Sequence, residues 1–148
     1  MRSIRMLAAV AFLAAAAAAL GWAWLHAEPP ATTTGDFGVT VRDADGHAIF
    51  NGTVHATNAT ALSVLQEAAR RAGFEVQVRS FGAYGGRACD GQYVESVAGR
   101  GAEGASGWVV RVWRKAAGEW SSPVQSAACE ALADGDAVEW RWTAAAAV

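Results

Sequence analysis

Hydrophobic and polar positions follow two periods along the chain, and these periods separate strands from helix. In the stretch FGVTV, Phe37, Val39 and Val41 share one side of a strand. Asp45-Gly46 predicts a hairpin turn before a second strand, HAIFNGTVHAT. Asn51-Gly52 inside that second strand predicts a bulge or a further turn. The first half of the domain is therefore expected to open with a β-hairpin.

One segment has a clear helical period, TALSVLQEAARRAG, from Thr60 to Gly73. Thr60 is a good N-cap, and Gly73 stands where a left-handed C-terminal cap is needed. Four residues are expected to form the buried stripe: Leu62, Leu65, Ala69 and Ala72. Four others are expected to face water: Gln66, Glu67, Arg70 and Arg71.

Strands follow the helix. FEVQVRSF alternates, with Phe74, Val76 and Val78 inward, and QYVESVAG and GWVVRVW predict two further strands. The chain order of two strands, one helix and several strands predicts an α+β fold, in which one helix packs on a mixed β-sheet. That is the β-grasp arrangement.

The end of the domain is expected to be a turn and a strand. Asp134-Gly135-Asp136 predicts a tight turn, whose carboxylates are explained by turn geometry. In the strand AVEWRW that follows, Val138, Trp140 and Trp142 share one face.

The run GRGAEG, residues 99–104, matches the glycine fingerprint of dinucleotide-binding folds. That fingerprint needs a helix behind it to hold the phosphates, and the next residues predict a strand. We therefore expect a connecting loop here and no nucleotide site.

The N-terminus predicts export. Arg2 and Arg5 precede an apolar run over residues 6–25 and a loose cleavage signal ending at Ala27. The run is also long enough to remain as a membrane anchor, so residues 1–27 are either a cleaved signal peptide or an N-terminal anchor. In both cases the rest of the chain is expected outside the cytoplasm, as an extracellular, periplasmic or cell-surface protein.

The domain organisation follows from this. Residues 28–37, with two prolines and small polar residues, predict a linker. Residues 38–143 form the predicted domain, and residues 144–148 a tail. Twelve basic side chains stand against fourteen acidic ones, without a basic stripe, so we expect no binding to nucleic acid.

The chain has two cysteines, Cys89 and Cys129. An oxidising compartment favours a disulfide between them, and two separate buried thiols are the alternative. Neither belongs to a Cys-x-x-Cys pair or has a histidine near it in sequence, which disfavours metal or redox chemistry.

No catalytic or metal-binding pattern is recognisable. The chain has no Gly-x-Ser-x-Gly or His-Glu-x-x-His motif, so we expect no enzyme and no cofactor. His47 and His55 have no second histidine or carboxylate at ligand spacing, and Asp43-x-Asp45-Gly46 does not complete a calcium loop. We expect no metal site.

Four stretches together resemble the transcobalamin-like C-terminal domain family of exported, largely bacterial proteins: TALSVLQEAARRAGFEVQV, GQYVESVAG, GWVVRVW and LADGDAVEWRW. The resemblance covers about residues 38–143 and implies a β-grasp fold with a cysteine pair at Cys89 and Cys129. It also suggests corrinoid, cobalamin-like ligands. Two features differ: Val112-Trp113-Arg114 replaces the family's tight Val-Asn-Gly turn, and the large helical domain that closes over cobalamin in vertebrate carriers is not seen in this sequence.

Aromatic residues are expected to form the contacts to a ligand or partner. Trp108 and Trp113 are separated by an odd number of positions in one strand, so they should face opposite sides. We expect Trp108 and one of Trp140 or Trp142 to be buried, and Trp113 and Trp120 to flank an exposed apolar patch. Tryptophans that merely cover the sheet are the alternative.

The candidate ligand contacts are Trp113, Trp120, Tyr84 and Tyr93. The leading hypothesis is an exported, non-catalytic module that binds a small ligand, with corrinoids as the specific candidate. The alternative is a module that binds another cell-surface protein and no small ligand.

Overall fold

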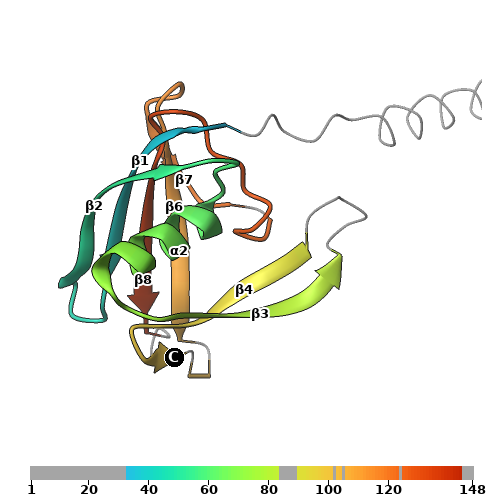
Figure 1. Ribbon diagram of the computed structural model, residues 1–148. Helices are drawn as coiled ribbons and strands as arrows, with labels where there is room; N and C mark the ends of the chain where they lie inside the picture. Colours follow the sequence, from blue (N-terminus) through green and yellow to red (C-terminus); the bar gives the residue numbers. More distant parts are fainter. Residues whose placement is uncertain (1–32, 84–89, 102, 105, 124, 145–148) are drawn as a thin grey trace, which may run out of the picture. The chain divides into compact units, whose positions relative to one another are not determined.

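A computed structural model describes residues 33–83, 90–101, 103–104, 106–123 and 125–144 (Figure 1). Contacts divide the chain into two units, Met1–Pro30 and Ala31–Val148, and every described residue belongs to the second. The predicted signal or anchor lies outside the described residues. Within the described ranges, no helix combines the length and the apolar character that a membrane span requires.

The main sheet has five strands. They are β1 (Gly35–Arg42), β2 (Ala48–Ala56), β6 (Gly107–Arg114), β7 (Glu119–Ser121) and β8 (Ala137–Thr143), in the spatial order β2-β1-β8-β6-β7. β1 runs parallel to β8, and the other neighbours are antiparallel. The two strands farthest apart in the chain are therefore neighbours within the sheet.

The predicted helix is confirmed as α2 (Ala61–Ala72). The Thr60 hydroxyl accepts a hydrogen bond from the Ser63 amide at 3.1 Å, while the Ser63 hydroxyl accepts one from the Thr60 amide at 2.8 Å. Gly73 closes the helix with a left-handed backbone at φ 76°. Both predicted caps are therefore confirmed.

The buried side of α2 is wider than the predicted stripe, and consists of Ala61, Leu62, Val64, Leu65, Ala68 and Ala69. The prediction for Ala72 was wrong: it is exposed, because the helix ends there and its final turn is not covered.

The apolar core lies between α2 and one face of the five-stranded sheet. Phe37, Val39 and Val41 of β1 are almost fully buried, as their alternation predicts. They pack in one cluster with the apolar side of α2 and with Val138 and Trp140 of β8. Figure 1 shows α2 lying across this face.

The predicted bulge or turn at Asn51-Gly52 was wrong. These residues pair regularly with Thr40 and Val39, and the register shifts at Val41/Arg42 instead. Gly52 has a packing role: a Cβ there would lie 3.2 Å from the Phe50 ring.

The prediction of a single mixed sheet was also wrong, because three of the strands form a separate sheet. They are β3 (Val76–Ala83), β4 (Asp90–Val97) and β5 (Arg100–Gly101), in that order. β3 pairs with β4 instead of joining the main sheet. The fold is α+β, with one helix and two sheets in the described residues.

The glycine run takes part in this second sheet. Ala98 and Gly99 have positive φ values of 50° and 78° and form the turn between β4 and β5. Strand β6 follows at Gly107, so the predicted strand after GRGAEG is confirmed.

Candidate functional site

The five-stranded sheet has two unlike faces. In β6, Val112 is fully buried and lies opposite Val138 of β8, on the side covered by α2. The next residue, Trp113, lies opposite Ala137 and points to the other side. We call that other side the open face. Its outward residues on β6, β7 and β8 are Val109, Arg111, Trp113, Trp120, Ala137, Glu139 and Arg141.

The structure brings Trp113 and Trp120 together on the open face. They are directly opposite each other in the β6–β7 register, with ring centroids 5.8 Å apart and an interplanar angle of 59°. The Arg111 guanidinium lies 5.1 Å from the Trp120 ring centroid, within range of a cation–π contact. Trp120 is 41% exposed and Trp113 is half-buried.

Beside this pair the open face has a shallow hollow of about 240 Å³. It is lined by Val109, Arg111, Ser122, Glu139, Arg141 and Thr143. Val109 is 50% exposed and lies opposite Arg141 in the β6–β8 register, so the hollow also presents an apolar side chain. Arg111 and Arg141 form no ion pair among the described residues, although Glu139 lies opposite Arg111 in the register.

The other two candidate aromatics do not join this cluster. Tyr93 lies on β4 in the second sheet, where it is exposed and contacts Phe81 at a ring distance of 6.3 Å. The Arg79 guanidinium lies 6.0 Å from the Tyr93 ring. Tyr84 lies outside the described residues.

The cysteine pairing stays a prediction. Cys129 is buried in the loop before β8, and Cys89 lies outside the described residues.

The remaining tryptophans of the described residues belong to the covered side. Trp140 and Trp142 are both buried, at 2% and 7% exposure, where only one was predicted to be. The Trp140 indole donates to the Ala61 carbonyl at 3.2 Å. Trp108 is half-buried against the core rather than buried, because its indole reaches outward to the Arg100 carbonyl at 2.8 Å.

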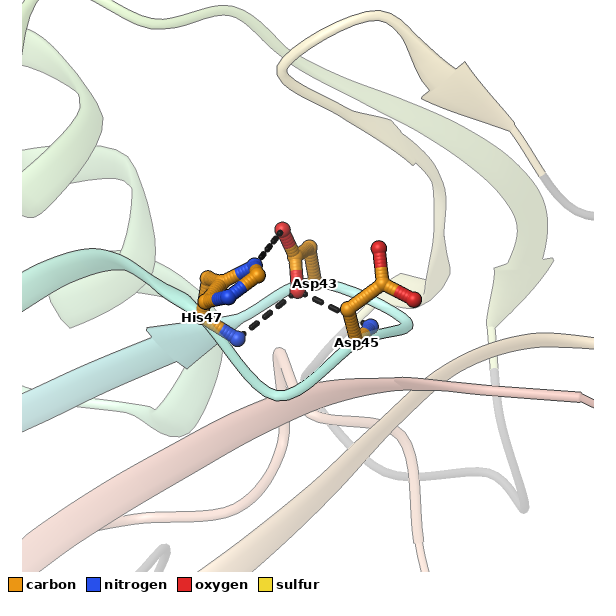
Figure 2. Close-up of side chains that lie close together, drawn as sticks. All are labelled: Asp43, Asp45 and His47. Carbon is orange, nitrogen blue, oxygen red and sulfur yellow. Dashed lines mark hydrogen bonds and ion pairs between the residues drawn. The ribbon is translucent and has the colours of Figure 1, made fainter.

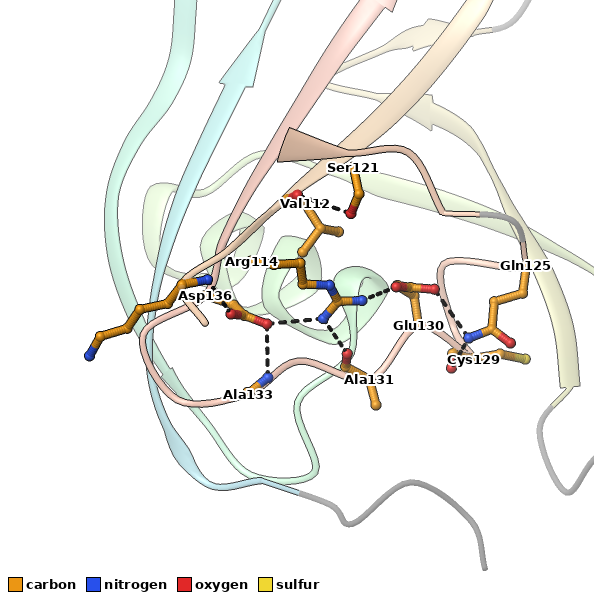
Figure 3. A network of polar contacts seen from close by, with 10 residues as sticks. Val112, Arg114, Ser121, Gln125, Cys129, Glu130, Ala131, Ala133 and Asp136 are labelled. Atoms are coloured by element: carbon orange, nitrogen blue, oxygen red, sulfur yellow. Dashed lines mark hydrogen bonds and ion pairs between the residues drawn. The ribbon is translucent and has the colours of Figure 1, made fainter. Parts of the chain in front are cut away.

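A polar network that the sequence analysis missed holds the loop before β8 (Figure 3). Arg114 donates to the Asp136 carboxylate at 2.9 Å, to the Ala131 carbonyl at 2.8 Å and to the Glu130 carboxylate. Asp136 is 2% exposed and also accepts hydrogen bonds from the Lys115 and Ala133 amides. The predicted turn role of Asp136 is confirmed, and its charge balances Arg114.

His47 and His55 each lie beside a carboxylate. The prediction that neither histidine has a carboxylate at ligand spacing was therefore wrong. His55 Nδ1 is 2.9 Å from the Asp36 carboxylate, and His47 Nδ1 is 3.6 Å from that of Asp43. The strand pairing and the turn bring them together, which sequence spacing does not reveal.

The potential ligand atoms of Asp43, Asp45 and His47 lie within 4.8 Å of one another (Figure 2). However, one Asp43 oxygen accepts hydrogen bonds from the Asp45 and His47 amides, at 3.0 and 2.8 Å. The Asp43 carboxylate therefore shapes the β1–β2 turn, and Asp45 and His47 are exposed. Such a cluster does not by itself make a metal site.

A comparison with models of protein families finds no matching family, and a search of curated proteins finds no match.

Proposed function

We propose that this chain is an exported, non-catalytic recognition module that binds an acidic surface of another exported or cell-surface protein through its open face. The observation that carries the proposal is the Trp113–Trp120 pair with Arg111 beside it, on the sheet face that α2 leaves uncovered. Tryptophan and arginine are the residues most enriched among those that dominate binding energy in protein interfaces.

The shape of the open face supports a macromolecular partner over a small ligand. Sites for drug-sized molecules are concave and enclose about 300–1,000 Å³. The hollow beside Arg111 and Arg141 is about 240 Å³, too small to enclose a corrinoid. A sheet face that exposes aromatic and arginine side chains is typical of a protein interface.

The charges favour an acidic partner. Arg111 and Arg141 point into the same hollow without an ion pair among the described residues, and Glu139 offsets only one of them. A carboxylate of the partner would form ion pairs with two guanidinium groups there. Apolar side chains of the partner beside that carboxylate would pack on Val109 and the tryptophans.

We further propose that the fold is a β-grasp. This proposal is supported by the β1–β2 hairpin, the helix that follows it and the parallel pairing of β1 with β8. Corrinoid binding remains the second candidate function; it rests on the resemblance described above and on that fold.

The test is site-specific photocrosslinking of the full chain in its native host, with p-benzoylphenylalanine at position 120. We expect a discrete crosslinked protein, identified by mass spectrometry, that disappears when Arg111→Glu is added. Position 81 is the matched control, because Phe81 is also an exposed aromatic but lies on the second sheet. Equal crosslinking from both positions would contradict the proposal.

A calorimetric titration with cobalamin and cobinamide separates the two candidates. We expect no heat of binding at ligand concentrations near millimolar. Saturable micromolar binding of either corrinoid would replace the proposal with the second candidate.

A further inference from the structure

The outer edge of β2 is a long strand edge without a partner in the described part of the chain. β2 is the outermost strand beside β1, and its nine residues, AIFNGTVHA, include no Lys, Arg, Asp, Glu or Pro. Soluble proteins usually protect such edges with charges, prolines or very short strands. The opposite edge fits that rule, because β7 has only three residues.

The hydrogen bonds identify which backbone groups point outward. In an antiparallel pair, alternate residues direct both backbone groups toward the neighbouring strand, and the others direct them away. The Thr53 carbonyl accepts a hydrogen bond from Arg71 Nη1 at 2.6 Å, so Thr53 belongs to the outward set. Asn51 and His55, two residues to either side, belong to the same set.

The hairpin end supports the same alternation. The Asp43 amide donates to the His47 carbonyl at 3.0 Å, which places this pair among those bonded across the hairpin. Hydrogen-bonded and non-hydrogen-bonded pairs alternate along β1 and β2 from this point, across the register shift. Val39 and Gly52 are then a hydrogen-bonded pair, and Thr40 and Asn51 are a non-hydrogen-bonded pair. The outward backbone groups of Asn51 and Thr53 therefore point away from β1, in the direction from which a further strand would pair.

We propose that β2 pairs with β2 of a second copy of this chain, antiparallel and centred on Thr53, so that one sheet runs through both copies. In this register Thr53 lies opposite Thr53, and Asn51 lies opposite His55 of the other copy. The pairing places no like charges opposite each other, and threonine pairs are favourable on a sheet surface. A twofold axis of this kind closes the assembly at two copies.

Arg71 regulates this edge. It occupies the Thr53 carbonyl, the acceptor that the Thr53 amide of the second copy needs, and it also lies 3.7 Å from the Glu67 carboxylate. The Arg71 side chain must therefore leave the edge before the copies pair. Its hydrogen bond keeps the association weak and reversible rather than preventing it.

The test is sedimentation equilibrium of the full chain in a density-matched mild detergent. We expect a monomer–dimer equilibrium that Thr53→Pro abolishes, because proline removes the outward amide. Thr53→Val, which keeps the amide and removes only the threonine pair, is the matched control and should weaken the dimer by no more than about fivefold. Arg71→Ala should tighten the dimer by about 25-fold, the value of two modest hydrogen bonds, one in each copy.

A second pair of variants tests the proposal even if Thr53→Pro fails to fold. Asn51→Glu with His55→Lys places opposite charges across the proposed axis, and Asn51→Lys with His55→Lys places like charges there. Both place the same lysine beside Asp36, which His55 contacts now. The first should dimerise at least about tenfold more tightly than the second.

Two results would overturn the proposal. The first is a dimer that is insensitive to the charge at position 51. The second is a monomer at all concentrations up to millimolar, for both the unchanged chain and Arg71→Ala.

Discussion

The two faces of the five-stranded sheet use the same type of residue in opposite ways. Trp140, on the covered face, is 2% exposed and donates its indole N–H to a helix carbonyl. Trp120, on the open face, is 41% exposed and contacts Trp113 with the two rings tilted by 59°. Strand parity alone decides which role a tryptophan takes, because α2 covers only one side. The comparison separates tryptophans that stabilise the fold from those available for binding.

The largest expected effect tests the covered face. Trp140→Ala should destabilise the domain by about 3–5 kcal/mol, through lost apolar burial and an unfilled cavity. Urea unfolding followed by circular dichroism measures this. A loss below about 1 kcal/mol would mean that Trp140 is not part of the core, since that is the cost of an average substitution.

The next effect concerns the predicted disulfide. If Cys89 and Cys129 are bridged, the double variant Cys89→Ser/Cys129→Ser should lose about 3–4 kcal/mol in the chain-entropy model. Unreduced protein should weigh two hydrogens less than reduced protein. A thiol that reacts in denaturant without prior reduction would disprove the bridge.

Substitutions of two aspartates in the same turn should have a smaller effect on stability, and the two can be compared directly. Asp136→Ala should cost about 2–3 kcal/mol, because it leaves the Lys115 and Ala133 amides without their buried acceptor and removes one of the two carboxylates paired with Arg114. Asp134 is exposed and accepts one hydrogen bond, from the Asp36 amide at 3.2 Å, so Asp134→Ala should cost about 0.5 kcal/mol. Equal losses in thermal unfolding would show that the Arg114 network contributes little.

The smallest effect tests the open face. Trp113→Ser should cost about 1 kcal/mol or less, the value of its contact with Trp120, and lower the melting temperature by at most about 4–8 °C. A drop as large as that of Trp140→Ala would place Trp113 in the core and remove the distinction between the faces.

The local features of this fold could be predicted because they depend on neighbouring residues. The helix caps at Thr60 and Gly73 and the alternation in β1 and β8 follow from spacing alone. Pairing between distant segments could not be predicted in this way. Nothing in the sequence of β3 says that it pairs with β4 rather than with the main sheet.

The candidate site shows the same division. The odd spacing of Trp108 and Trp113 predicted opposite faces, whereas the contact of Trp113 with Trp120 depends on the β6–β7 register. The Arg114–Asp136 network joins a strand end to a loop, so no short pattern reveals it.

The parallel pairing of β1 with β8 also determines when the fold can form. These two strands are neighbours in the sheet, although nearly all of the domain lies between them in the chain. A chain emerging from its N-terminus can form the β1–β2 hairpin and α2 early, but β1 keeps one edge without a partner until β8 arrives. Closing so long a loop is slow. Folding of this domain is therefore completed only after its last strand is delivered, and a chain stopped before β8 would present an open strand edge in the middle of its sheet.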